Sequence, residues 1–93
     1  MLLNIFYHGL ESELLFNKLY NNLDENSLLL IQDGVYFGLS IKDKPTVQNI
    51  FALETDVTAR GLLDIFNSIN NIKLINYDEF INLILKHDKN ITW

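Results

Sequence analysis

Four short apolar segments constrain the fold of this 93-residue chain more than any other feature. They cover residues 2–7, 27–32, 48–53 and 72–75. Runs of this length that are almost entirely apolar are typical of strands buried on both faces of a sheet. The longer segments that separate them carry apolar residues at helical spacing. Alternating strands and helices predict an α/β domain, with a mainly parallel sheet and helices on both of its faces.

Three helices are expected between and after these strands. The first follows Ser12, a residue type that caps helices well, and runs through residues 14–23. The second covers residues 54–61 and opens with acids, which the helix dipole favours in the first turn. The third follows residues 76–79, where Asn and Glu stand at the spacing of a capping box. Strand and helix therefore alternate along most of the chain.

The chain is expected to form a single domain, residues 1–93, because no linker or low-complexity stretch divides it. A domain of this size buries only about 60 to 65% of its unfolded surface, so the core is thin. Residues 34–40 form either a short helix or an irregular crossover, and residues 42–46 a charged loop that contains proline. The opening MLLNIFY has no basic leader or cleavage site, which favours a first strand over a signal peptide. No stretch approaches the roughly 20 apolar residues of a membrane helix, so no membrane partner is expected.

Charge and composition exclude several classes of function. The net charge of −5 and the pI near 4.7 argue against binding to nucleic acid, which depends on clustered Lys and Arg. The chain contains no cysteine, so it has no disulfide, thiolate metal site or thiol nucleophile. His8 and His87 are the only histidines and lack the spacing of a metal motif. No metal or cofactor is therefore expected.

The pair Asp33–Gly34 follows the second apolar segment, where an α/β sheet places its functional loops. Asp33 could act as a general acid or base, but Asp before Gly is also a common turn signature, and the turn is the favoured interpretation. A triad of His8, Ser12 and Asp33 can be imagined, yet no nucleophile elbow supports it. No catalytic residue is predicted.

Trp93, the only tryptophan, is the last residue of the sequence. Chain ends usually fray unless they dock, and a large aromatic side chain is costly to leave in water. Trp93 could fold back on its own domain, or it could anchor a subunit interface, where tryptophan is enriched. The sequence favours neither alternative.

Taken together, these segments resemble the TusB/DsrH family of sulfur-relay proteins. The order and spacing of QDG, ALxxDxxARGL, the YxxF segment and the KH tail that ends in Trp are much more specific than any short motif above. The resemblance covers nearly the whole chain, apart from a variable loop around residues 40–47. The matching stretches are Met1-Leu2, LLLIQDGV at 28–35, FALETDVTARGL at 51–62 and INYDEFINLILKHDKNITW at 75–93.

The resemblance implies a small α/β fold shared with DsrE and DsrF, and a cytoplasmic complex with TusC-like and TusD-like subunits, built as a dimer of heterotrimers. Such a complex accepts persulfide sulfur from TusA and passes it through TusE toward thiolation of the tRNA wobble uridine, with the sulfur carried on a TusD cysteine. Persulfide transfer needs a thiolate. This cysteine-free chain is therefore expected to be a non-catalytic, structural subunit that contacts no nucleic acid directly.

The resemblance also suggests architectural roles for particular residues. Asp33 is expected to fix the turn, accepting backbone N–H bonds, Gly61 to end a helix in left-handed geometry, and Arg60 to pair with an acid or a partner carbonyl. Two alternatives remain: a free-standing homo-oligomeric interaction module, and, more weakly, a small hydrolase or regulator using Asp33 and His8. Without partners, the chain is expected to self-associate. The candidate structural or interface residues are Gln32, Asp33, Gly34, Arg60, Gly61, His87 and Trp93.

Overall fold

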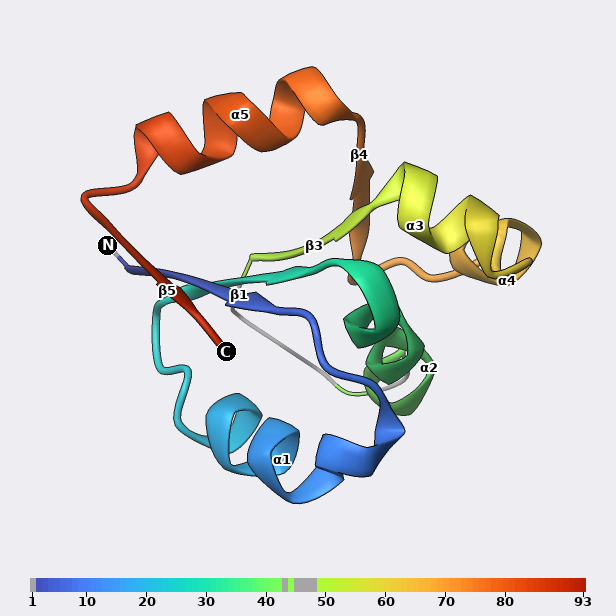
Figure 1. Cartoon of the computed structure of the whole chain (residues 1–93), viewed down its shortest axis with the longest axis horizontal. Coiled ribbons are helices and arrows are strands. Elements are labelled where there is room, and N and C mark those ends of the chain that lie inside the picture. The colour runs from blue at the N-terminus through green and yellow to red at the C-terminus, as the bar shows by residue number, and fades with distance from the viewer. Residues whose placement is uncertain (1, 43, 45–48) are drawn as a thin grey trace.

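Five parallel strands form one sheet at the centre of the molecule (Figure 1). The computed structural model describes residues 2–42, 44 and 49–93. The strand order is β4-β3-β2-β1-β5, so the two strands from the first half of the chain occupy the middle of the sheet, with β3 beside them. The strands are β1 (Leu2–Phe6), β2 (Ser27–Leu30), β3 (Ile50–Leu53), β4 (Lys73–Ile75) and β5 (Lys89–Thr92).

Helices cover both faces of this sheet, but unequally. The ten-residue helix α5 lies alone on one side, at the top of Figure 1, whereas the other helical segments pack against the opposite face. The α/β class, the parallel pairing and the cover on both faces confirm the sequence-based prediction. The helical segments are η1 (Leu10–Ser12), α1 (Glu13–Asn21), η2 (Gln32–Phe37), α2 (Gly38–Ile41), α3 (Glu54–Ala59), α4 (Leu63–Asn67) and α5 (Tyr77–Lys86), with η denoting a 3₁₀ helix.

The sequence analysis missed three described elements: the short 3₁₀ turn η1, helix α4 and strand β5. Strand β5 lies at the sheet edge with all four residues exposed, so it lacks the apolar pattern that marks a buried strand. Helix α4 has only five residues, too few for helical periodicity to show. Residues 34–40 are helical, as the 3₁₀ turn η2 followed by α2. Strands β1 and β2 end before the predicted segments 2–7 and 27–32 do, and β4 begins one residue after its predicted start at 72. Most of the loop at 42–46, with residue 48, lies outside the described residues.

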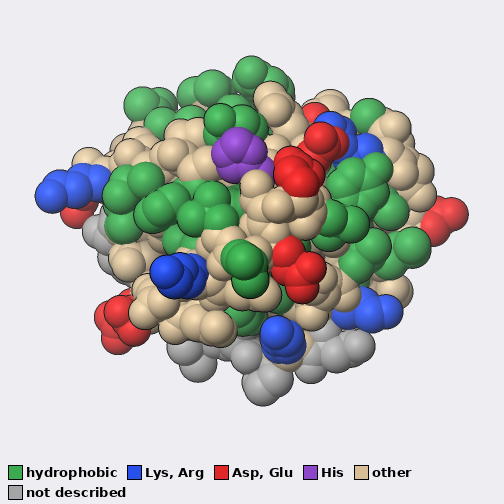
Figure 2. Space-filling view, turned by 60° about the horizontal axis from the view of Figure 1, so that its bottom comes forward, with side chains coloured by type: hydrophobic (Ala, Val, Ile, Leu, Met, Phe, Trp, Pro, Cys, Tyr) green, Lys and Arg blue, Asp and Glu red, His purple; other side chains and the backbone are tan. Residues whose placement is uncertain are grey.

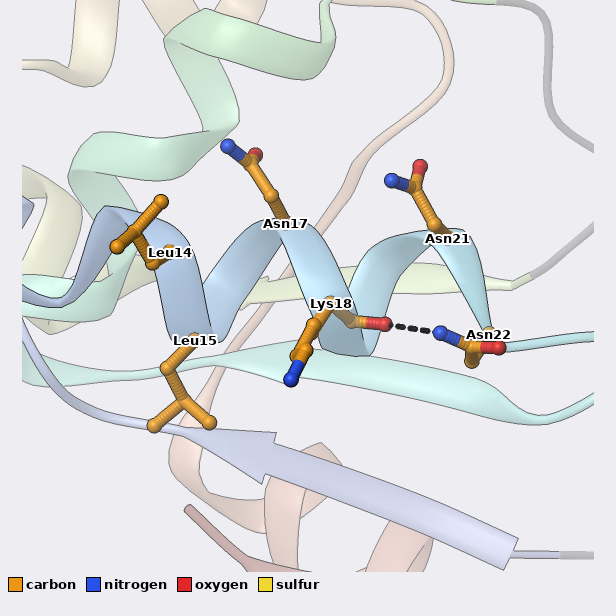
Figure 3. Close-up of a pocket in the computed structure, with 6 residues that line it drawn as sticks. All are labelled: Leu14, Leu15, Asn17, Lys18, Asn21 and Asn22. Carbon is orange, nitrogen blue, oxygen red and sulfur yellow. Dashed lines mark hydrogen bonds between the residues drawn. The ribbon is translucent and has the colours of Figure 1, made fainter.

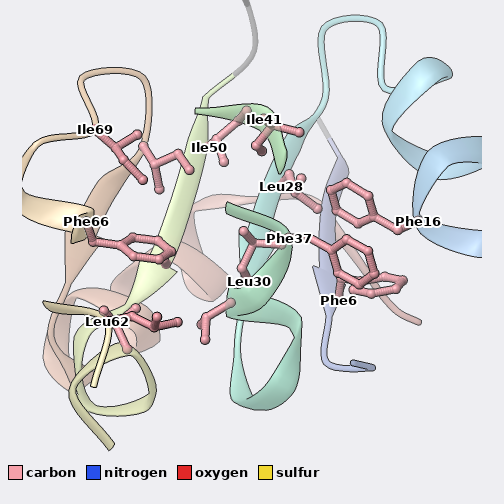
Figure 4. Packing of buried hydrophobic residues seen from close by; sticks show 14 of the residues in the cluster. Phe6, Phe16, Leu28, Leu30, Phe37, Ile41, Ile50, Leu62, Phe66 and Ile69 are labelled. Atoms are coloured by element: carbon pink, nitrogen blue, oxygen red, sulfur yellow. The ribbon is translucent and has the colours of Figure 1, made fainter. Parts of the chain in front are cut away.

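The larger core lies between the sheet and η2, α1, α2, α3 and α4 (Figure 4). Three phenylalanines at its centre are at most 1% exposed. The rings of Phe16 and Phe37 stack with centroids 4.2 Å apart, and Phe6 meets Phe37 edge-on at 5.5 Å. Such aromatic contacts add to the free energy gained by burying apolar area. This cluster is therefore the main source of folding stability.

The smaller core lies on the opposite face, under α5. Its buried members all come from strands, while α5 contributes side chains that are only partly buried. No helix within the described residues is long and apolar enough to cross a membrane. The buried residues are Leu3, Ile5, Leu29, Leu53 and Ile75, and the partly buried α5 side chains are Phe80, Leu83 and Ile84.

Candidate functional site

The turn after β2 lies at the carboxyl edge of the sheet and begins with a strained residue. Gln32 has a φ of 49°, in the left-handed region that residues with a Cβ seldom adopt. Its backbone N–H donates a 2.7 Å hydrogen bond to Oδ2 of Asp56 at the start of α3. Gly34 then passes so close to β1 that a Cβ there would overlap the carbonyl oxygen of Phe6. Glycine is therefore required at position 34 by packing.

Arg60 ties this turn to α3. Its Nε and Nη2 lie 3.0 and 2.9 Å from Oδ1 of Asp33, and its Nη1 donates a 3.1 Å bond to the carbonyl of Asp56. The same Nη1 lies 3.7 Å from Oδ1 of Asp56. Arg60 was predicted to pair with an acid or a partner carbonyl, and the acid that it pairs with is Asp33. The backbone N–H of Gln32 in the turn donates to Asp56 and not to Asp33. Asp33 acts here as an ion-pair partner.

The end of α3 has the geometry that its sequence predicts. Gly61 follows the last helical turn with a φ of 69°, and its N–H donates a 3.0 Å bond to the carbonyl of Thr58. A glycine in the left-handed region at this position is a frequent helix terminator. The reversal lets the chain enter α4 directly. It also holds Arg60 at the helix end, facing the turn after β2.

His8 and Tyr7 follow β1 at the same edge. Their rings stack with centroids 4.3 Å apart, and the His8 ring also meets Phe6 edge-on. No described hydrogen bond joins the side chains of His8, Ser12 and Asp33, and Asp33 is instead engaged by Arg60. Nor does any group of three or more His, Asp or Glu residues in the described part of the chain form a metal-binding cluster.

The C-terminal tail is held at two points, the first of which is His87. Its Nδ1 lies 2.8 Å from the carbonyl of Leu83, and its Nε2 lies 3.1 Å from Oγ of Ser27. A carbonyl can only accept, so Nδ1 carries the proton and, in the neutral ring, Nε2 accepts from the hydroxyl of Ser27. Ser27 is buried at the start of β2. His87 thereby fixes the end of α5 to the sheet.

Trp93 is the second point. Its Nε1–H donates a 3.0 Å bond to Oδ1 of the buried Asn4, and its backbone N–H donates to the carbonyl of Ile5 at 2.8 Å. The indole ring packs against the larger core. Asn4 in turn lies 3.4 Å from the carbonyl of Ser27. Trp93 therefore folds back onto its own domain, at the end of β5, and its possible part in an interface stays a prediction.

Three residues of these networks were not singled out from the sequence: Asn4, Ser27 and Asp56. The single polar residue in the first apolar segment was the available signal for Asn4, because a buried amide needs hydrogen-bond partners. Nothing local to Ser27 or Asp56 indicates a partner, since their contacts are 60 and 24 residues away in sequence.

The comparisons with known proteins agree with this fold and with these segments. The family model described as "DsrH like protein" matches residues 11–90, most of the chain. The chain belongs to the DsrH-like family. Two curated relatives named "Protein TusB", from Yersinia pestis (strain Pestoides F) and Yersinia pseudotuberculosis serotype O:1b (strain IP 31758), are each 37% identical over 76 residues, which cover 74% of this chain and 76% of theirs.

A solved structure extends the likeness of this DsrH-like chain to its whole fold. The crystal structure of the ychN protein from E. coli superposes with a TM-score of 0.73, covering 99% of this chain and 97% of that one. Its sequence is 19% identical, so the similarity is one of fold alone. The recognition of a TusB/DsrH-type sequence from its motifs is thus confirmed.

Proposed function

We propose that this chain is a non-catalytic structural subunit of a TusBCD-type sulfur-relay complex. In this role it assembles with TusC-like and TusD-like subunits, as a dimer of heterotrimers in the cytoplasm. The complex takes persulfide sulfur from TusA and passes it toward TusE for thiolation of the tRNA wobble uridine. Membership of the DsrH-like family and the similarity to proteins named TusB support this proposal.

One observation carries the structural role: the 93 residues contain no cysteine. In persulfide transfer, a thiolate of the acceptor attacks the outer sulfur of the donor persulfide, the S–S bond breaks, and the donor leaves as a thiolate. The acceptor then holds the sulfur as a new persulfide. Without a thiol, this chain cannot hold sulfur in that form, so the active cysteine belongs to the TusD-like partner.

The arrangement of the carboxyl edge also supports an architectural role. Asp33, Arg60 and Asp56 are joined to each other and to the backbone of the turn. These contacts hold the turn after β2 against α3. Large apolar side chains, by contrast, stand in water on both sides of the sheet, including Leu14 at 84% exposure and Leu85 at 77%. Exposed apolar surface of this kind is typical of proteins that bind other proteins.

Native mass spectrometry after co-expression with the TusC-like and TusD-like chains of the same source tests the proposal. The expected result is a complex with two copies of each chain, in which a persulfide forms on the TusD-like subunit and is lost when its cysteine is replaced by serine. Recovery of this chain alone, with both partners present and folded, would contradict the proposal.

The alternative is a free-standing homo-oligomeric interaction module with no part in sulfur transfer. The exposed apolar side chains favour it equally, because a second copy can cover them as well as a different subunit can. The same co-expression experiment separates the two functions. Assemblies that contain only this chain favour the module, and mixed assemblies favour the relay.

A further inference from the structure

A crevice opens between α1, the start of β1 and the end of β5. Its volume is about 370 Å³, at the lower end of the range for sites that bind small molecules. Figure 3 shows Leu15 and Lys18 on the side of α1 that faces β1, where they form one wall. We name it the α1–β1 crevice, and it is lined by Leu2, Asn4, Leu15, Lys18, Leu19, Asn22, Asn26 and Trp93.

Apolar side chains form much of the surface of this crevice. Leu15 is 37% exposed, and Leu2 and Trp93 are half-buried, so all three are accessible to a ligand. The indole of Trp93 is already fixed, because its Nε1–H donates to Asn4. A ligand that packs against this indole therefore causes no further loss of side-chain freedom. Aromatic groups are the most favourable occupants, since aromatic pairs gain more than their buried area alone supplies.

The hydrogen-bonding capacity that stays free in the crevice belongs largely to donors. Asn4 is 3% exposed; its oxygen accepts from Trp93, and its Nδ2 makes only a long 3.4 Å contact with the carbonyl of Ser27. Asn26 also uses its oxygen, which accepts from the N–H of Leu2 at 3.2 Å. An amide nitrogen carries two protons, so both side chains keep an N–H group for an acceptor. A buried amide is expected to use such a proton.

Among the described residues, Lys18 is the only charged one that lines the crevice. In this part of the chain, no hydrogen bond or ion pair engages its ammonium group. The hollows beside α5 differ, because an acid, Glu79 or Asp88, accompanies Lys86 in each of them. Charge complementarity therefore favours an anion in the α1–β1 crevice, even though the chain as a whole has a net charge of −5.

A larger hollow on the same side of the molecule is less suited to a ligand. Its volume is about 550 Å³, but the described residues that line it all belong to α1 and its C-cap, so it has no second wall. In Figure 2, where the α1 side comes forward, hydrophobic side chains reach the surface in several places, separated by uncharged atoms and single charged groups. The α1–β1 crevice instead places apolar walls, amide donors and one cation around a single volume.

We propose that the α1–β1 crevice binds a small aromatic carboxylate. The ring packs against Leu15 and the indole of Trp93, and the carboxylate binds the ammonium group of Lys18. The amide N–H groups of Asn4 and Asn26 are further donors for the acceptor atoms of the ligand. The site lies away from the carboxyl edge of the sheet, and the proposal does not depend on the relay function.

Phenylacetate tests the proposal on the whole chain, with the neutral phenylacetamide as a matched ligand. Trp93 is the only tryptophan, so a nitrogen–proton correlation spectrum contains one indole signal, which comes from the wall of the crevice. Phenylacetate should shift this signal saturably with a Kd on the order of 1 mM, as expected for a fragment-sized ligand. Phenylacetamide should bind about three- to fivefold more weakly, because it forms no ion pair.

Two results of this titration would overturn the proposal. One is the absence of a saturable shift up to about 10 mM phenylacetate, tenfold above the expected Kd. The other is equal affinity for the two ligands, which would show that the carboxylate is not recognised.

Lys18→Gln is compared with Lys86→Gln, a control on α5. Both lysines are exposed on helices, so both variants are expected to fold. Lys18→Gln should weaken phenylacetate binding about three- to fivefold and bring its Kd to that of phenylacetamide. Lys86→Gln should change neither Kd. Equal losses in the two variants would show a general attraction of anions and would overturn the proposal.

A second pair of variants tests the apolar wall without changing any charge. Leu15→Ala should weaken both ligands about three- to fivefold, because apolar contact with the ring is lost. Leu14→Ala is the control, since Leu14 is on the same helix and does not line the crevice. It should leave both affinities unchanged. Unaltered binding to the Leu15→Ala variant would place the ligand elsewhere and overturn the proposal.

Discussion

The two faces of the sheet are stabilised in different ways. On one face, η2 and the helices α1 to α4 bury a large apolar cluster around three phenylalanines whose rings contact one another. On the other face, α5 alone covers a small cluster, and none of its ten residues is buried. The crowded face therefore depends on packing in its interior, whereas α5 combines half-buried packing of Phe80, Leu83 and Ile84 with polar contacts at its two ends.

Those end contacts are well defined. At the N-terminus of α5, the side chain of Asn76 accepts a 2.9 Å bond from the N–H of Glu79, and the side chain of Glu79 accepts a 3.0 Å bond from the N–H of Asn76. At the C-terminus, His87 joins Leu83 to the buried Ser27. The capping box stabilises the helix itself, and the contact of His87 with Ser27 is the one of the two that joins α5 to the sheet.

The largest expected effect comes from removing an aromatic ring on the crowded face. Phe37→Ala should lower the free energy of unfolding by about 3 to 5 kcal/mol, because it opens a cavity where the ring is 1% exposed. Phe80→Ala, on the half-buried side of α5, should cost only about 1 to 2 kcal/mol. Urea denaturation followed by circular dichroism measures both. Equal losses would contradict the difference between the faces.

The second effect tests the C-terminal attachment of α5. His87→Ala should cost about 1 to 3 kcal/mol, because the hydroxyl of Ser27 is left buried without its partner. Ser27→Ala removes the same contact from the other side, so the double variant should cost less than the sum of the two single variants. Strict additivity in this cycle would mean that the bond contributes nothing to stability.

The difference between the faces also explains what could be predicted from sequence. The central strands and the parallel sheet follow from apolar runs, because strands buried on both faces carry no polar alternation. Strand β5 could not be found in this way, since Lys89–Thr92 lies exposed at the edge and is held by backbone bonds to β1. Its attachment depends on Trp93 and Asn4, which are 89 residues apart.

The residues of the candidate site also fall into two groups, those whose geometry follows from local sequence and those whose contacts depend on the fold. The left-handed geometry of Gly61 and the capping box at Asn76 are local, so residue type and spacing predict them. The choice of Asp33 as the partner of Arg60 depends on the fold, which brings the end of α3 beside the turn after β2. The role of His87 depends on the fold to the same degree, because Ser27 belongs to a different strand.

A third and smaller effect compares two helix caps. Asn76→Ala should cost about 1 kcal/mol, the usual value for losing an N-cap side chain. Ser12, which precedes α1 on the crowded face, makes no such hydrogen bond from its side chain, so Ser12→Ala should be nearly neutral. Thermal unfolding of the two variants distinguishes them. A larger loss of stability for Ser12→Ala than for Asn76→Ala would contradict the expectation that the helix cap contributes more on the thinly covered face.

The smallest effect is expected at the ion pair between Asp33 and Arg60. The side chain of Asp33 is 60% exposed, so water and salt screen the pair, and Asp33→Asn should cost about 0.5 kcal/mol or less while keeping an acceptor for Arg60. Asp33→Ala removes the acceptor as well and should cost more. If Asp33 has only this architectural role, Asp33→Asn leaves both assembly with Tus partners and sulfur transfer unchanged. Normal folding and assembly with a selective loss of transfer would instead assign Asp33 to the relay itself, and would move the functional centre of the molecule to the carboxyl edge of the crowded face.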